Sequence, residues 1–179
     1  ILSFLATIGM LVWLQMDQDK HNLPRRLAIF GGFCLFKGMS IGHFIHALLL
    51  IDPSIIVTAF LGTTAVFLCF SAAAVLSKRR SYMYLGGILS SVMSAMFMMR
   101  LVNMFIWSEA MAVASLYIGL FMFMGWVLVD TQQMIERASL GAGDVALDAA
   151  NLFVNFVAIF VRLAIILARN SSKKKNSRR

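Results

Sequence analysis

The feature that most constrains this chain is a series of apolar runs long enough to cross a lipid bilayer. Residues 55–76 contain no charged side chain, and comparable runs precede and follow them. A hydrocarbon core about 30 Å thick needs about 20 such residues per helix, and only helices or closed barrels satisfy their backbone polar groups in lipid. The runs are continuous and do not alternate with period two, which excludes a barrel. We therefore predict an all-α fold, a polytopic membrane helical bundle.

Composition and charge agree with this class and argue against a soluble domain. Apolar residues make up 60% of the chain, too many for a water-soluble domain that avoids large exposed apolar patches. The net charge of +8 comes from Lys and Arg at the ends of the runs and in the C-terminal tail, a pattern typical of membrane topology. We expect the lipid bilayer as a partner and no nucleic acid. Cys34 and Cys69 lie inside apolar runs and predict no disulfide framework.

Six hydrophobic segments are predicted. They cover residues 1–16, 27–51, 55–76, 82–107, 111–129 and 150–168. We expect residues 1–169 to form the transmembrane bundle and 170–179 to form a basic tail. The first residue is Ile1, already inside an apolar run, so we expect at least one upstream element to be missing.

Loop charges predict the orientation of these segments. The connections at 17–26 and 78–80 are basic, whereas those at Asp52 and Glu109 are short and acidic, so the basic ones are assigned to the cytosol. A full span by the sixth segment would then place the basic tail on the other side, against the same rule. The conflict is resolved either if this segment is re-entrant or incompletely inserted, or if the charge bias of the tail is overridden. A glycosylation sequon at residues 170–172 is usable only if the tail is luminal.

Polar groups within the predicted segments are candidates for function because they are costly in lipid. Asp130 directly follows an apolar run and must be solvated, paired or protonated. It is either part of a functional site or an interfacial residue that caps the following loop. Spacings of three, four and seven put four polar residues on one face of the last segment: Asp148, Asn151, Asn155 and Arg162. That face is either an interhelical hydrogen-bond seam or part of an ion or proton path.

Three basic residues are candidate counter-ions for these groups: Arg100, Arg162 and His46. Arg100 either serves in this way or extends toward the membrane surface. Gly38 and Gly42 form a small-xxx-small pair one turn before His46, which permits a close helix contact. A second histidine three residues before His46 has no evident third ligand, so we expect a buried neutral histidine hydrogen-bonded inside the bundle and no metal site.

Residues 141–144 read Gly-Ala-Gly-Asp, the short signature of intramembrane aspartyl proteases. That chemistry needs two apposed carboxylates on neighbouring membrane helices that share a proton. Here the motif lies in a polar connection soon after Asp130. We interpret it as a Gly-rich turn in which Asp144 caps the next helix.

Several motifs, in order along the whole chain, resemble those of the Bax inhibitor motif family. They are Asp52-Pro53-Ser54-Ile55, Thr58-Ala59-Phe60-Leu61-Gly62-Thr63, Arg79-Arg80-Ser81-Tyr82, Leu85-Gly86-Gly87-Ile88-Leu89, Leu128-Val129-Asp130-Thr131-Gln132 and Asn151-Leu152-Phe153-Val154-Asn155-Phe156. The resemblance implies a seven-helix fold of which this chain lacks the first helix. It also implies a multi-pass protein of the endoplasmic reticulum membrane that suppresses cell death and lets calcium leak from the lumen in a pH-sensitive way. No enzymatic activity and no cofactor are implied, calcium being the transported ion.

In the family, two aspartates from the last two long helices share a proton and gate the pore. Asp130 matches the first aspartate, but the second falls at Asn155. Asn151 stands where some relatives carry an acid, and His46 where glutamate is frequent. An amide cannot share a proton with a carboxylate as a second carboxylate does. We therefore expect Asn155 to donate a hydrogen bond to Asp130, Asp148 to be a candidate substitute acid, and any ion leak to depend less on pH than in relatives.

Without the resemblance, two classes of function stay open. One is a small ion channel or transporter. The other is a membrane interaction protein that regulates cell-death partners, such as Bcl-2-type membrane proteins, through helix contacts and without conducting ions.

Overall fold

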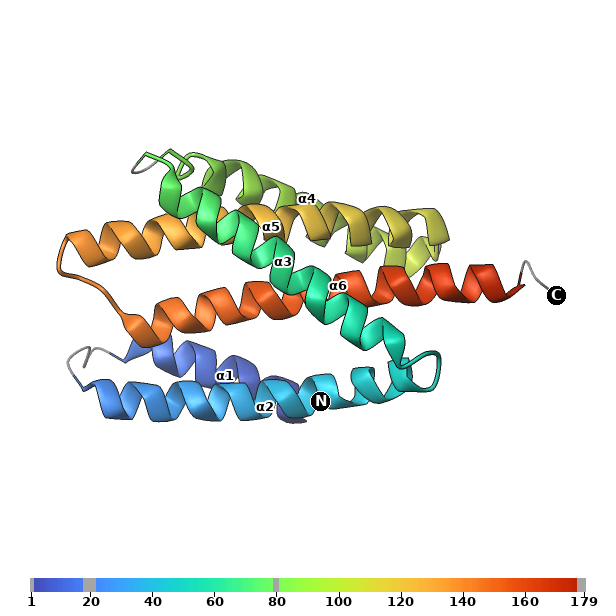
Figure 1. The fold of residues 1–179 in the computed structure, drawn as a ribbon, viewed down its shortest axis with the longest axis horizontal. Coiled ribbons are helices and arrows are strands. Elements are labelled where there is room, and N and C mark those ends of the chain that lie inside the picture. Colours follow the sequence, from blue (N-terminus) through green and yellow to red (C-terminus); the bar gives the residue numbers. More distant parts are fainter. Residues whose placement is uncertain (1, 18–21, 79–80, 177–179) are drawn as a thin grey trace.

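The computed structural model describes residues 2–17, 22–78 and 81–176, and the regular structure in these ranges is helical (Figure 1). Six helices follow one another: α1 Leu2–Met16, α2 Leu23–Leu49, α3 Ser54–Leu76, α4 Leu85–Ile106, α5 Glu109–Ser139 and α6 Val145–Asn176. The helices α2 to α6 are long and apolar enough to cross a membrane, and α1 is a shorter apolar helix. The predicted all-α membrane bundle is confirmed, and its spans contact the lipid bilayer.

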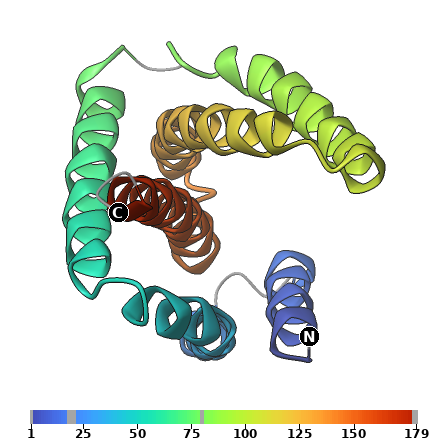
Figure 2. The same ribbon diagram turned by 90° about the vertical axis from the view of Figure 1, so that its right-hand side faces the viewer.

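The last helix occupies the centre of the bundle. Seen end-on, α6 lies in the middle with α3 and α5 on two sides and the α1–α2 pair below (Figure 2). Small side chains allow this packing, since Ala59 on α3 and Ala164 on α6 are fully buried in one shared cluster. Within the described residues, α4 packs only against α5. It is therefore the outermost helix.

Both α5 and α6 are longer than the segments predicted for them. The sequence predicted a long connection over residues 130–149, whereas the connection is residues 140–144. Asp130 therefore lies inside α5 and not after its end. The helix continues because Thr131, Gln132 and Glu136 are buried against the bundle, where packing favours the helical path over local polarity.

The turn between α5 and α6 has the predicted character. Gly141 adopts a left-handed backbone with φ 71°, which a glycine tolerates without strain. Asp144 Oδ1 accepts a hydrogen bond of 3.2 Å from the backbone N–H of Leu147, as expected of a helix cap. The interpretation of residues 141–144 as a turn with a capping Asp144 is confirmed.

Connections gather at the two ends of the bundle. Figure 1 shows the C-terminal ends of α1, α3 and α5 at one end, and those of α2, α4 and α6 at the other. α6 is one continuous helix long enough to cross a membrane, so it is not re-entrant, and it runs past the predicted boundary at residue 169 into the tail. The basic residues Lys20, Arg79, Arg80, Arg178 and Arg179, on which part of the charge argument rests, lie outside the described residues.

Gln132 fastens the connection between α3 and α4 to α5. Its Oε1 accepts a hydrogen bond of 2.8 Å from the backbone N–H of Tyr82. Its Nε2 donates to Ser77 Oγ at 2.7 Å and to the carbonyl of Lys78 at 3.1 Å. One buried amide thus satisfies backbone groups that the end of α3 would otherwise leave open.

Candidate functional site

Residues spaced by multiples of seven on α5 face residues spaced by seven on α6. Because seven residues make about two turns, each set stays on one side of its helix. We call these eight residues the seam: Glu109, Phe123, Asp130 and Arg137 on α5, and Asp148, Asn155, Arg162 and Arg169 on α6. The helices run antiparallel (Figure 1), so the seam pairs early residues of α6 with late residues of α5.

The middle of the seam joins Asp130 to Asn155. The amide Nδ2 of Asn155 donates a hydrogen bond of 2.6 Å to Asp130 Oδ2. Asn155 is buried and Asp130 is partly buried. The expected hydrogen bond from Asn155 is present, and it gives the carboxylate a partner within a membrane-crossing helix.

One step along the seam, Asp148 pairs with Arg137. Arg137 Nη2 lies 2.9 Å from Asp148 Oδ1, and the Asp148 side chain is only 5% exposed. Asp148 is near enough to Asp130 for the two charges to interact, but its direct partner is Arg137. Arg137 was not predicted as a site residue, although its position seven residues after Asp130 was a usable signal.

A cavity of about 260 Å³ opens beside Asp130. Asn151 and Asn155 line it together with Asp130, and the remaining wall is apolar except for Trp126. The indole N–H of Trp126 is buried and has no hydrogen-bond partner among the described residues. The cavity thus offers one carboxylate and two amides in largely apolar surroundings, which suits water or a hydrated cation.

Further along the seam, Arg162 lies over the ring of Phe123, with its guanidinium carbon 4.3 Å from the ring centroid. Its Nη1 donates to the carbonyl of Ala158 at 3.0 Å. Gly119 leaves room for this side chain, since a Cβ at that position would come within 2.5 Å of Arg162 Nε. No carboxylate of the described residues pairs with Arg162, so it is not a counter-ion of Asp130.

The other two predicted counter-ions lie away from Asp130. Arg100 on α4 has no acidic partner in the described part of the chain, and it lies close enough to Arg162 for the two guanidinium groups to repel each other. His46 is exposed on α2, so the expectation of a buried histidine is wrong. Gly38 and Gly42 make no close helix contact, because a Cβ on either would meet nothing within 4 Å. The close contact that this glycine pair permits is therefore not made among the described residues.

A second charged group, missed in the sequence, ties the α1–α2 pair to the turn before α6. The guanidinium of Arg26 is 2% exposed. It donates to the carbonyls of Leu14 and Asp17 at 3.0 and 2.8 Å and to the carboxylate of Asp144. Only the fold could reveal this pairing, because Arg26 and Asp144 are 118 residues apart.

Comparison with known proteins supplies an independent line of evidence. The family described as "Inhibitor of apoptosis-promoting Bax1" matches residues 1–172. A "Probable Bax inhibitor 1" of Paralichthys olivaceus is 42% identical over 180 residues, which span 100% of this chain and 76% of that relative. "Bax inhibitor 1" of Bos taurus is 40% identical over 99% of this chain and 76% of its own length. The protein of that name in Arabidopsis thaliana is 40% identical over 98% of this chain and 71% of its own length.

Proposed function

Because this chain belongs to the family of inhibitors of apoptosis-promoting Bax1, we propose that it restrains cell death as a multi-pass membrane protein. The names of its relatives describe Bax inhibitors, and the family description adds that Bax1 promotes apoptosis, so the proposed role is regulatory and not enzymatic. We place the protein in the membrane of the endoplasmic reticulum, where it lets calcium leak from the lumen. Microscopy of the tagged chain against markers of that membrane tests the location.

The observation that carries the proposed leak is Asp130 beside its cavity. A carboxylate within a membrane-crossing helix is costly and is typical of ion pathways. Asp130 and the amides of Asn151 and Asn155 supply oxygen atoms of the kind that Ca²⁺ prefers. These oxygens would receive the ion as it sheds part of its water.

The hydrogen bond between Asn155 and Asp130 is the proposed gate. It joins the central helix α6 to α5 beside the cavity. Two carboxylates at this point would repel when ionised and share a proton when one is neutral, which makes such a pair steeply sensitive to pH. The amide of Asn155 does not titrate, so the gate of this chain changes less between pH 6 and 8.

Calcium efflux from proteoliposomes tests this function. We expect the wild-type chain to leak calcium with a shallow dependence on pH. Asp130→Asn should alter the leak, because the carboxylate is lost, and Asn155→Asp should make it steep in pH. Asp52→Asn and Asn170→Asp carry the same chemical changes at positions outside the seam and should behave as wild type.

Two outcomes would contradict the leak. If Asp130-dependent gating stayed steep in pH in the wild-type chain, the role given to Asn155 would be wrong. If none of the variants conducted, the chain would act through helix contacts with Bcl-2-type membrane proteins, and co-purification with such partners would become the decisive measurement.

A further inference from the structure

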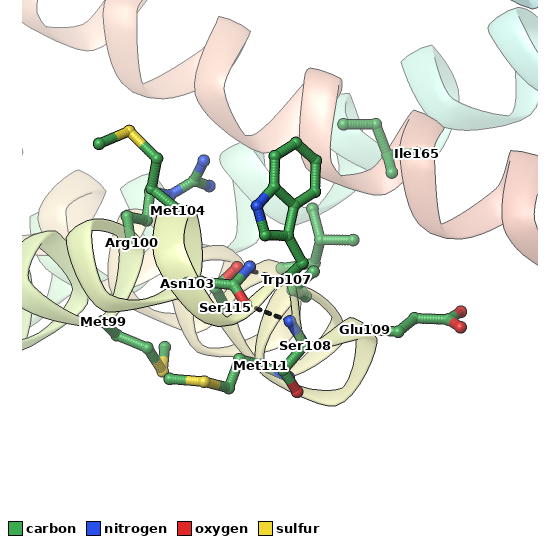
Figure 3. A pocket seen from close by; sticks show the side chains of 12 residues that line it. Met99, Arg100, Asn103, Met104, Trp107, Ser108, Glu109, Met111, Ser115 and Ile165 are labelled. Atoms are coloured by element: carbon green, nitrogen blue, oxygen red, sulfur yellow. Dashed lines mark hydrogen bonds between the residues drawn. The ribbon is translucent and has the colours of Figure 1, made fainter.

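A larger cavity lies at the opposite end of the seam, near the turn between α4 and α5 (Figure 3). It has a volume of about 630 Å³ and is lined by residues of α4, α5 and α6, among them Arg100, Asn103, Trp107 and Ile165. In the described structure α4 and α6 do not pack against each other. The cavity therefore opens sideways between them, toward the surface that meets lipid.

The charges around this cavity are unbalanced. Arg100 lines it and is exposed, without an acidic partner among the described residues. Arg162 lies near Arg100, and its Nε is buried with no hydrogen-bond partner in the described part of the chain. Two unneutralised cations in membrane-crossing helices are costly. An anion placed against Arg100 would remove the repulsion between them.

Glu109 also lines the cavity but does not supply this negative charge. Its carboxylate forms an ion pair with Arg169. In Figure 3 its side chain points away from Arg100. The described residues that line the cavity therefore supply no anion for Arg100.

The backbone conformation of Trp107 helps to shape the cavity wall. Trp107 ends α4 with φ 53°, a left-handed conformation that is unfavourable for a bulky residue. Asn103 fixes this turn, because its Oδ1 accepts a hydrogen bond of 2.8 Å from the backbone N–H of Ser108. The strained turn directs the indole toward the space between α4 and α6 (Figure 3).

The surroundings of the cavity are apolar and face outward. Met104, Phe105 and Trp107 are 61%, 79% and 85% exposed. Aromatic residues at the end of a membrane helix lie at the depth of lipid headgroups. A ligand at this place needs an anionic group for Arg100 and hydrocarbon for the outer face of α4.

We propose that this cavity binds a membrane lipid through its anionic headgroup. Arg100 contacts the headgroup, and the positive charge of Arg162 nearby adds electrostatic attraction. The acyl chains lie along the exposed face of α4. The phosphate or carboxylate of the headgroup supplies the negative charge that the arginines lack. The proposal does not depend on calcium conduction.

Quenching of Trp107 fluorescence by brominated lipids tests the proposal. Trp13 and Trp126 are replaced by Phe, so that Trp107 alone reports. The chain is placed in bilayers of phosphatidylcholine with either brominated phosphatidylserine or brominated phosphatidylcholine as the minor lipid. We expect the anionic lipid to be preferred about fivefold, as for one basic residue at an anionic surface, and Arg100→Gln to abolish that preference.

Matched variants keep the result interpretable. Arg25→Gln removes the same charge at the other end of the bundle and should leave the preference unchanged, while Arg100→Lys should retain most of it. Circular dichroism and gel filtration show whether Arg100→Gln is folded. Equal quenching by both lipids in the otherwise unaltered chain, or a preference that survives in folded Arg100→Gln, would overturn the proposal.

A competition experiment distinguishes binding of a lipid headgroup from binding of a free anion. Inorganic phosphate is titrated against chloride at constant ionic strength, with the brominated anionic lipid present. We expect the quenching to stay unchanged. If phosphate displaced the lipid and chloride did not, the site would bind a soluble anion and the lipid assignment would be wrong.

Discussion

One neutral hydrogen-bond donor stabilises the Asp130 carboxylate inside the bundle. In a bilayer, a carboxylate needs a partner or a proton, and the amide of Asn155 supplies the one side-chain hydrogen bond found for it in the described structure. Asn151 lines the same cavity without making such a bond. Replacing Asn155 is therefore expected to lower the stability more than replacing Asn151, which lies one turn earlier on α6.

We expect Asn155→Ala to destabilise the protein by about 1–3 kcal/mol, because it leaves a partly buried carboxylate without its donor. Asn151→Ala removes the same side chain one turn earlier and should cost less. Thermal unfolding of the purified protein in detergent measures both. Equal stability of the two variants would mean that water replaces the lost donor.

Individual residues also show where the sequence was informative. The alignment of Asp148, Asn155 and Arg162 on one face is a property of the α-helix, so spacing alone predicted it. Their partners Arg137 and Phe123 depend on how α5 lies against α6. The turn at residues 140–144 sets that register. The polar composition of residues 130–149 predicted a long loop in its place.

Among the elements, the α1–α2 pair is attached to α6 by both packing and charge. Phe33 and Ala150 belong to one buried cluster, and Arg26 binds the end of α1 and the cap of α6 at once. The sequence predicted both helices of the pair but could not predict this attachment, because buried ion pairs between distant segments leave no local pattern. The sequence also could not show that Gly38 and Gly42 are exposed, because a small-residue motif does not identify the helix that packs against it.

Two neighbouring arginines give a matched test of that attachment. Arg26→Met should cost about 3–5 kcal/mol, because it leaves the buried carboxylate of Asp144 without its cationic partner. Arg25 has a side chain that is 48% exposed and lies 3.7 Å from Asp17, so Arg25→Met should cost less than about 1 kcal/mol. Unfolding in detergent with increasing denaturant compares them. Similar midpoints would show that Arg26 is not essential to the joint.

For the whole molecule, the arrangement of the helix ends makes a definite prediction about sidedness. The end of α6 lies with the connections after α2 and α4, away from the connection after α3 (Figure 1). The charge rule and the geometry therefore disagree about the tail, and the geometry is the stronger constraint because α6 is continuous.

Labelling of single cysteines checks this sidedness. In a background with Cys34 and Cys69 replaced by Ala, Leu50→Cys and Ser172→Cys should react with an impermeant maleimide from one side of sealed vesicles. Ser81→Cys should react from the other side. All three positions are exposed. Labelling of Ser172→Cys together with Ser81→Cys would contradict a membrane-crossing α6.

The central position of α6 has a consequence for how the protein is made. Ribosomes synthesise chains from the amino terminus, so α1, α2, α3 and α5 enter the membrane before the helix that they surround. Until Val145–Asn176 is inserted, Asp130 has no Asn155 and Arg26 has no Asp144. The nascent bundle therefore lacks both of these contacts until its final segment is in place. Membrane chaperones that shield polar groups during insertion would act on the chain in this interval. A chain that ends before α6 would leave the same polar groups exposed permanently.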